Sequence, residues 1–165
     1  MSRTPVDLGA IVARARNGPC FICQFVAGNP DFAHHRIVED DEHVAFLSKY
    51  PTQRGYALVC PRQHVEDLAR DLDGAAYLRL QAMVHRLSRA MQQVFDTERI
   101  YVLSLGSKQG NSHLHFHVVP LPPGIPYEQQ QYHALMAEHG VLSLDDAEMA
   151  VIAQALSEAY SGLPD

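Results

Sequence analysis

The sequence lacks three features that would assign it to common classes of protein. It has no run of lysine or arginine residues, no apolar stretch approaching the roughly 20 residues that cross a bilayer, and only three cysteines. Its first residues, MSRTPVDLGAIVARAR, contain neither a continuous apolar segment nor the small-residue cleavage site of a secretory signal. We therefore expect a cytoplasmic protein that does not enter a membrane and has no disulfide framework.

The charge and length of the chain narrow the range of its partners. The net charge of −6 does not provide the positive surface of a protein that grips a nucleic acid polymer. With 165 residues, of which 47% are hydrophobic, the chain is long enough to bury a core, and it contains no repeat or linker that would divide it. We expect one domain, residues 1–165, that binds a small molecule.

The pattern of apolar residues predicts an α+β fold. Five segments have the length and the flanking turn residues of strands, and the first three lie too close together for crossover connections, so they should pair antiparallel. These segments are HRIVED (35–40), HVAFLSKY (43–50), GYALVCPR (55–62), ERIYVLSLG (98–106) and HLHFHVVPL (113–121). We expect Pro120 and the prolines after it to end the last strand, because proline has no N–H for a ladder.

We expect the start of the chain to be flexible, and we predict helices in two later parts of the chain. Between Val65 and Phe95 apolar residues recur every three or four positions, which predicts a long amphipathic helix. The C-terminal part should contain two more helices, at residues 127–139 and 144–160. The second of these has Ser143 as its expected N-cap and ends near Gly162.

The last predicted strand carries three histidines at alternate positions. Successive side chains of a strand point to opposite faces, so His113, His115 and His117 would share one face and apolar residues the other. Three imidazoles on one face need solvent, a metal or a ligand as partners. A solvated strand face is the simplest alternative, and a catalytic metal site with three histidine ligands is another.

The loop before these histidines favours phosphate chemistry. Residues 106–112, GSKQGNS, have the composition of a turn whose backbone N–H groups can surround an anion. A neutral imidazole with one nitrogen held by an acceptor is a nucleophile toward phosphorus, and His115 is flanked on both sides for that role. His117 and the loop donors would stabilise charge on the phosphate oxygens. No cluster of carboxylates lies near the motif in sequence, so we expect no requirement for Mg²⁺.

These residues resemble the histidine triad, or HIT, superfamily of nucleotide hydrolases and transferases. HLHFHVV matches the family's His-φ-His-φ-His-φ-φ signature, in which φ is an apolar residue. From Cys20 to Pro120, the segments CFIC, EDDEHVAFL, GYALVCPRQH and QGNSHLHFHVVP follow the order and approximate spacing of the bacterial branch. The resemblance implies a HIT-like five-stranded antiparallel sheet with one long helix, usually paired into a homodimer. It covers residues 20–120 and leaves 121–165 as a C-terminal helical extension.

The resemblance also implies a reaction. His115 would attack the α-phosphate of a nucleoside phosphoramidate or a dinucleoside polyphosphate, with His117 beside it, and form a nucleotidyl-histidine intermediate. Hydrolysis of that intermediate would release a nucleoside monophosphate. A nucleotidyl transferase or phosphorylase of the same family, in which phosphate replaces water, is an alternative that the sequence leaves open. A nucleotide-binding regulatory module with little turnover is another.

The implied substrate contacts fall into three groups. Gln109, Asn111 and Ser112 would line the phosphate. Ser48 stands where many relatives carry an aspartate for the ribose hydroxyls, and Lys49 beside it could reach a phosphate or a carboxylate. The candidates for the nucleobase pocket, each an equally plausible core residue, are Phe21, Ile22, Phe25 and Phe46.

The Cys-x-x-Cys pair, Cys20 and Cys23, is typical of both metal sites and redox pairs. Members of the family that keep this pair complete a structural zinc site with the histidine of the Pro-Lys/Arg-x-His segment and the first triad histidine. By resemblance, the four ligands of a structural Zn²⁺ are therefore Cys20, Cys23, His64 and His113. A reduced thiol pair without metal is the alternative. His34 and His35 are competing ligands by their proximity in sequence, although a surface role is the favoured interpretation for both. Cys60, inside the apolar run ALVC, is expected to be a small buried hydrophobe.

Overall fold

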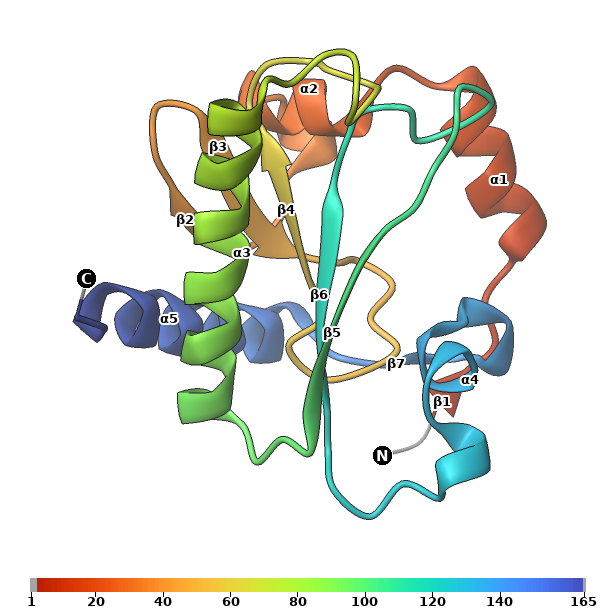
Figure 1. The fold of residues 1–165 in the computed structure, drawn as a ribbon. Coiled ribbons are helices and arrows are strands. Elements are labelled where there is room, and N and C mark those ends of the chain that lie inside the picture. The colour runs from red at the N-terminus through yellow and green to blue at the C-terminus, as the bar shows by residue number, and fades with distance from the viewer. Residues whose placement is uncertain (1–2, 165) are drawn as a thin grey trace.

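The structure, a computed structural model, describes residues 3–164 and contains a five-stranded antiparallel sheet flanked by helices (Figure 1). The strands are β2 (Arg36–Glu39), β3 (His43–Leu47), β4 (Ala57–Pro61), β5 (Arg99–Ser104) and β6 (Phe116–Leu121). Their spatial order is β2-β3-β4-β6-β5, and every neighbouring pair is antiparallel. The predicted α+β class and antiparallel sheet are confirmed.

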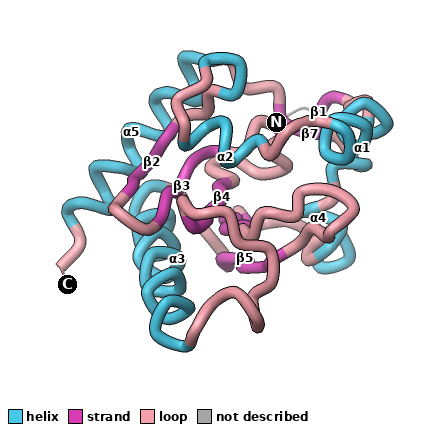
Figure 2. Tube along the Cα trace, turned by 90° about the horizontal axis from the view of Figure 1, so that it is seen from above, coloured by secondary structure: helices cyan, strands magenta, loops and turns pink. Residues whose placement is uncertain are grey.

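Helices and a small second sheet surround the main sheet. The helices are α1 (Leu8–Asn17), α2 (Phe21–Val26), α3 (Gly74–Val94), α4 (Tyr132–Leu135) and α5 (Asp146–Gly162). Two short strands, β1 (Arg3–Thr4) and β7 (Val141–Leu142), pair antiparallel and so join the first described residues to the segment before α5. Figure 2 shows β1, β7 and α1 on the side of the molecule opposite α3. No helix within residues 3–164 is long and apolar enough to cross a membrane.

Alternation of side chains along the sheet divides the core between its two faces. From β3, Ala45 and Leu47 pack into a cluster with residues of α3 and α5. Val44 and Phe46 point the other way and pack with residues of α2. Cys60 of β4 joins the α2 side with no exposed surface, so it is the small buried hydrophobe that was predicted. The sheet is therefore covered on both faces.

Helix α3 begins later than the sequence pattern indicated. It starts at Gly74 because the Asp73 side chain caps it, accepting a backbone N–H of the first turn at 2.8 Å. Before it, the Asp71 carboxylate accepts two backbone N–H groups of the preceding turn at 2.9 Å each. This carboxylate satisfies donors that a helix would have used. The prediction of a helix from Val65 was therefore wrong for residues 65–73.

The triad segment enters the sheet later than predicted. Strand β6 begins at Phe116, so His113 and His115 lie just before it. The backbone N–H of Leu114 donates to the carbonyl oxygen of Val65 at 2.7 Å and not to a neighbouring strand. The alternation of faces still holds, because Leu114 and Phe116 belong to the core on the α3 side.

Strand β6 also continues through Pro120, which was predicted to end it. The carbonyl oxygen of Leu121 accepts the N–H of Glu98 on the β5 side at 2.8 Å. The backbone nitrogen of Pro120 therefore faces the opposite edge, where the ladder with β4 extends only as far as Val118. The missing N–H of proline costs no ladder hydrogen bond at this position.

The tail is helical in part, with different caps and breaks from those predicted. Residues 127–139 form short turns around α4 and not one helix, and Gln131 has a φ of 53° where a helix would need a negative value. Helix α5 is capped by Asp145 and Glu148, which form a capping box. Ser143, the predicted cap, instead lies with its hydroxyl 2.6 Å from that of Thr4.

The start of the chain, expected to be flexible, forms α1. Asp7 caps this helix by accepting a backbone N–H at 2.9 Å, and the helix has no fully buried residue. Its apolar residues were too few to give a pattern for a core-facing helix. The short helix α2 follows directly after Cys20 and was not predicted either.

Candidate active site and metal centre

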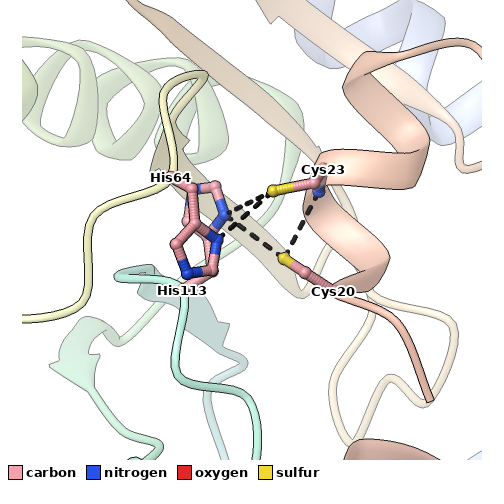
Figure 3. A group of neighbouring side chains, drawn as sticks. All are labelled: Cys20, Cys23, His64 and His113. Atoms are coloured by element: carbon pink, nitrogen blue, oxygen red, sulfur yellow. Dashed lines mark hydrogen bonds between the residues drawn. The ribbon is translucent and has the colours of Figure 1, made fainter.

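Four sulfur- and nitrogen-bearing side chains from separate segments converge on one point (Figure 3). Cys20 and Cys23 lie at the start of α2, where the Cys20 sulfur accepts the N–H of Cys23 at 3.4 Å. His64 follows β4 and His113 precedes β6. The ligand atoms of the four residues all lie within 4.8 Å of one another. The structure thus brings together the four residues that the family resemblance implied as metal ligands.

Hydrogen bonds outside this cluster set which nitrogen of each histidine faces the sulfurs. Nε2 of His113 lies 2.8 Å from the carbonyl oxygen of Pro61, and Nε2 of His64 lies 3.1 Å from the Glu66 carboxylate. Each Nε2 therefore carries the proton and donates it, which leaves a lone pair on each Nδ1. These Nδ1 atoms lie 3.3–3.5 Å from the cysteine sulfurs. Burial lowers the pKa of His113 to about 4, so its ring is neutral, as a metal ligand requires.

The spacing of these atoms fits a tetrahedral metal ion. Zn–S bonds of about 2.3 Å and Zn–N bonds of about 2.0–2.1 Å give tetrahedral edges of roughly 3.4–3.8 Å. The observed sulfur–nitrogen distances of 3.3–3.5 Å are close to that range. Burial and the adjacent Cys20 raise the pKa of the Cys23 thiol to about 11, because loss of water and a neighbouring sulfur both disfavour the thiolate. A divalent cation supplies the charge that would stabilise both thiolates, so the four residues could hold a metal ion.

The two competing histidines have other partners. The ring of His34 packs against Phe46, with centroids 4.9 Å apart, and its Nδ1 donates to the carbonyl oxygen of Phe32 at 2.7 Å. Nε2 of His35 lies 3.0 Å from the Asp146 carboxylate at the start of α5. Neither ring belongs to the cluster of cysteine and histidine ligands. Their suggested role as alternative ligands was therefore wrong.

The middle histidine of the triad is oriented as a nucleophile. Nδ1 of His115 lies 2.6 Å from the backbone carbonyl oxygen of His113, which accepts its N–H. Nε2 keeps its lone pair, and the ring, which is only 4% exposed, lines a cavity. Burial lowers the pKa of His115, so the imidazole is neutral near neutral pH. The result is a nitrogen nucleophile with a fixed tautomer.

The third histidine is held by a tyrosine that the sequence did not single out. The Tyr56 hydroxyl lies 2.9 Å from Nδ1 of His117, and the two rings stack with centroids 5.7 Å apart. We assign the hydroxyl as the donor, because a phenol is a stronger acid than an imidazole N–H. Burial and the adjacent His115 lower the pKa of His117 to about 3, so the ring is neutral and its one proton lies on Nε2. This Nε2 is buried and has no partner within residues 3–164, so it is free to donate to a ligand oxygen.

The cavity around these histidines has the size of a ligand pocket, about 690 Å³. Three buried side-chain polar atoms within residues 3–164 have no hydrogen-bond partner, and two of them belong to residues of its lining, Thr52 and His117. Buried polar atoms in native proteins are almost always paired. A polar ligand in the cavity would supply the missing partners.

Most of the predicted substrate contacts line this cavity. They are Phe21, Ser48, Lys49, Gln109, Asn111 and Ser112. Ile22 and Phe46 have no exposed surface and pack with Phe25 and Leu58 in the core on the α2 side. They do not line the cavity, so their interpretation as base-contacting residues is corrected to a core role. The aromatic wall consists instead of Phe21, Phe32 and His34.

The loop at residues 106–112 offers fewer backbone donors than its composition suggested. Ser107 and Gly110 exchange two backbone hydrogen bonds of 3.0 and 3.1 Å, and the Ser107 hydroxyl accepts the N–H of Gln109. Among the hydrogen bonds found in residues 3–164, none uses the N–H of Asn111 or Ser112. The N–H groups of Gly106 and Lys108 are likewise unused among these hydrogen bonds. Of these four residues Lys108, Asn111 and Ser112 line the cavity, so their N–H groups are the available phosphate donors on this side of it.

Several contributing residues were missed because their roles depend on contacts between distant segments. Glu66 accepts hydrogen bonds from Ser112 at 2.7 Å and from His64 at 3.1 Å, and these two bonds lower the pKa of its carboxyl group. Glu66 thus links the loop at residues 106–112 to the metal cluster. Tyr56 stood within the GYALVCPRQH segment, and only its position one strand away from His117 reveals its role.

Comparisons with known proteins identify the family of the chain. Residues 29–123 match the HIT domain. An uncharacterized HIT-like protein of Saccharolobus solfataricus is 36% identical over 106 residues, which are 61% of this chain and 73% of that protein. The adenosine 5'-monophosphoramidase of Schizosaccharomyces pombe is 28% identical over 106 residues, 62% of this chain and 74% of its own.

Solved structures show the same fold. A Zn-bound histidine triad family protein of Mycobacterium smegmatis has a TM-score of 0.68 and 24% identity, covering 86% of this chain and 93% of that one. A hypothetical histidine triad nucleotide-binding protein of Sulfolobus tokodaii has a TM-score of 0.68 and 21% identity, covering 86% and 92%. The metal cluster, the oriented middle histidine and the match over residues 29–123 lead to one conclusion: the chain belongs to the HIT domain family.

Proposed function

We propose that this protein hydrolyses a nucleotide at its α-phosphate, through a nucleotidyl intermediate on His115, and releases a nucleoside monophosphate. The observation that carries the proposal is the orientation of His115. Its Nδ1 is held 2.6 Å from the His113 carbonyl oxygen, which leaves the Nε2 lone pair for attack. The name of one relative, an adenosine 5'-monophosphoramidase, supports this class of substrate.

In the first step Nε2 of His115 attacks the phosphorus, a phosphorus–nitrogen bond forms, and the bond to the leaving group breaks with its electron pair. A phosphate chain leaves as an anion, whereas the nitrogen of a phosphoramidate takes one proton from solvent and leaves as ammonia. The ring then carries a positive charge, which the His113 carbonyl oxygen stabilises through the Nδ1–H. The Nε2–H of His117 donates to a nonbridging oxygen. The N–H groups of Asn111 and Ser112 would do the same.

In the second step water attacks the phosphorus, the phosphorus–nitrogen bond breaks, and its electron pair returns to Nε2 of His115. The water contributes its oxygen to the monophosphate and releases one proton to solvent. The charge that develops on phosphate meets the same donors in both steps, because the two transition states occupy one position. This sequence of steps needs no Mg²⁺.

The proposed nucleobase contacts are the aromatic residues of the cavity wall. Phe21, Phe32 and His34 line it, and a base can stack on rings of this kind. Ser48 and Lys49 also line the cavity, and Ser48 uses its hydroxyl to accept the N–H of Tyr50 at 3.2 Å. We therefore assign Lys49 to a charged group of the substrate and the Ser48 side chain to the local turn.

We propose that the metal of the four-residue cluster is a structural Zn²⁺. The closed set of two thiolates and two imidazoles leaves no position for substrate, which is typical of structural zinc. Its chemistry would be confined to holding α2, the segment after β4 and the segment before β6 together. Because its thiolates must stay reduced, we place the protein in the cytoplasm.

We also propose that two copies pair through the edge of the sheet. Strand β5 is an edge strand, in which Val102 is 45% exposed, and Leu105 just after the strand is 55% exposed. An unpaired edge with apolar residues is a surface that a second copy would cover. Light scattering of the purified protein tests this, and a monomer at micromolar concentration would reject it.

The second candidate reaction uses inorganic phosphate in place of water. The cavity of about 690 Å³ has room for an acceptor beside the nucleotide, so this transferase or phosphorylase reaction uses the same residues. The binding-module alternative predicts nucleotide affinity with little turnover. The oriented lone pair of His115 favours turnover, since a protein that only binds has no need of it.

The deciding experiment measures AMP release by chromatography from adenosine phosphoramidate and from diadenosine polyphosphates, with and without added phosphate. Wild type is compared with His115→Asn, which removes the nucleophile from a site that is 4% exposed and keeps a similar polar shape. We expect release by wild type and at least a 1,000-fold slower rate in the variant, since removing a nucleophile has effects on the order of 10³ or more. AMP release that is equal in the two proteins would reject the proposal, and ADP formation only with added phosphate would favour the phosphorylase.

A further inference from the structure

Helix α1 lies outside residues 29–123, which match the HIT domain, yet it forms part of the cavity wall. Ile11 and Ala15 are one helical turn apart on a single face, both are half-buried, and both line the cavity. Ala15 also packs against the loop at residues 106–112. A Cβ atom placed on Gly110 of this loop would lie 3.5 Å from the Cβ atom of Ala15. The helix therefore sits against the loop that surrounds the nucleophile.

The position of α1 relative to the nucleophile is fixed at two points. A Cβ atom on Gly106, in the same loop, would lie 3.4 Å from a carbon of the His115 ring. The chain that leaves α1 reaches the metal cluster within three residues, at Cys20. One loop thus contacts both α1 and the nucleophile, and the metal cluster holds the end of the helix.

This helix brings positive charge to the cavity. The lining contains four lysine and arginine side chains and one carboxylate, that of Asp31, in a chain whose net charge is −6. The four cations are Arg14, Arg16, Lys49 and Lys108. Clustered positive charge in an otherwise negative protein concentrates its field at the cavity and attracts anions.

Arg14 is held in place at the edge of the cavity. Its Nη2 donates to the Tyr50 hydroxyl at 2.6 Å, and its guanidinium carbon lies 5.9 Å from the centre of the Tyr50 ring, which also lines the cavity. The remaining N–H groups of Arg14 are available to a ligand. Surface arginines are usually only solvated, but this one is fixed in direction by two contacts with a residue of the same wall.

The chemistry of the leaving group gives these cations a use. A phosphate chain leaves as an anion, and the charge on it grows as the bond to the α-phosphorus breaks. The neutral His117 donates a hydrogen bond but supplies no positive charge. Ammonia, the leaving group of a phosphoramidate, departs without negative charge and needs no cation.

We propose that Arg14 and Arg16, together with Lys108, form a subsite for the leaving group, and that the preferred substrates are nucleotides whose leaving group is itself a chain of phosphates. This inference rests on the proposed function and narrows its substrate class. Bidentate arginine contacts to phosphate strengthen as charge develops, so the subsite favours the transition state for such substrates.

The test compares two substrates in three proteins. The measured quantity is the ratio of kcat/KM for diadenosine tetraphosphate to kcat/KM for adenosine phosphoramidate. The proteins are wild type, Arg14→Gln/Arg16→Gln, and a control, Arg70→Gln/Arg79→Gln, which removes two exposed arginines outside the cavity lining. We expect the ratio to fall at least tenfold in the first variant, because hydrogen bonds to charged groups are strong, and by less than twofold in the control.

A ratio that stays within twofold of wild type in the α1 variant would overturn the inference, including the case in which both activities fall together. A binding measurement keeps the inference testable if the wild type hydrolyses neither compound, an outcome that would reject the proposed function itself. In the His115→Asn background, calorimetry gives the affinities for AMP and for diadenosine tetraphosphate. The compared quantity is the affinity for diadenosine tetraphosphate divided by the affinity for AMP. A tenfold decrease of this ratio after Arg14→Gln/Arg16→Gln supports the subsite, and an unchanged ratio overturns it.

Discussion

Replacing Tyr56 with phenylalanine isolates one hydrogen bond of the candidate active site. The Tyr56 hydroxyl lies 2.9 Å from Nδ1 of His117, and its ring stacks on the imidazole at an interplanar angle of 21°. Tyr56 is 7% exposed, and phenylalanine keeps the ring, the stacking and nearly all of the buried volume. We therefore expect Tyr56→Phe to fold normally and to lose only the partner of Nδ1.

The size of the effect follows from the environment of that nitrogen. A buried acceptor without a partner costs roughly 1–3 kcal/mol. Without the hydroxyl the tautomer of His117 is no longer fixed. A proton on Nδ1 would still lack a partner, and it would turn the Nε2 lone pair toward the phosphate oxygens in place of a donor. Since about 1.4 kcal/mol corresponds to tenfold in rate, we expect kcat to fall roughly 5- to 150-fold.

Two measurements test this prediction. Steady-state release of AMP gives kcat and KM, and nitrogen chemical shifts of the histidine rings report which nitrogen carries the proton. The control is Tyr77→Phe on α3, whose ring packs on the other side of the sheet with a centroid 6.5 Å from that of Phe116. A kcat within twofold of wild type, with the His117 proton still on Nε2, would refute the reasoning.

Three further predictions concern stability. Cys23→Ser should lose the proposed metal and about 3 kcal/mol of stability, lowering Tm by roughly 6–12 °C, whereas Cys60→Ala, outside the cluster, should keep the metal in elemental analysis. Burial lowers the pKa of His117 to about 3 from an ordinary value near 6.5, so the unfolded chain binds the extra proton first and stability falls as the pH drops from about 6.5 toward 3. Urea unfolding at pH 7 and pH 5 should show a smaller difference in His117→Gln than in wild type. Asp145→Ala should lower the free energy of unfolding by about 1 kcal/mol through loss of the α5 cap, and Ser143→Ala, which leaves the capping box intact, should lower it less.

The sheet could be predicted from the sequence because its patterns are local. Strands β3 and β4 are short apolar runs between turn residues, and such runs are distinctive at this length. The start of α3 could not be predicted in the same way. Residues 65–73 satisfy a helical apolar pattern, but the Asp71 carboxylate pairs with their backbone donors in a turn, and that choice depends on side-chain geometry.

The residues of the candidate site differ in the same way, since local patterns predicted some of them and contacts between distant segments determine the others. The spacing of His113, His115 and His117 in the sequence identified the triad, since residue type and period were enough. Tyr56 and Glu66 act through contacts with segments more than 40 residues away, as their bonds to His117 and Ser112 show. Phe46 and Ile22 were ambiguous, because an apolar residue in a strand or short helix fits a pocket wall as well as a core. Only the face on which each lies decides between these roles.

His113 connects the metal cluster to the nucleophile. Its Nδ1 faces the two cysteine sulfurs, its Nε2 donates to the Pro61 carbonyl oxygen at 2.8 Å, and its own carbonyl oxygen accepts the Nδ1–H of His115 at 2.6 Å. The ring of His113 is thus fixed on both sides, and the peptide that orients the nucleophile is attached to it. A metal bound at this cluster would have no contact with substrate, yet it would hold the carbonyl oxygen that sets the tautomer of His115. Loss of the metal should therefore lower kcat as well as Tm, because a His115 ring released from that carbonyl can place its proton on the attacking nitrogen.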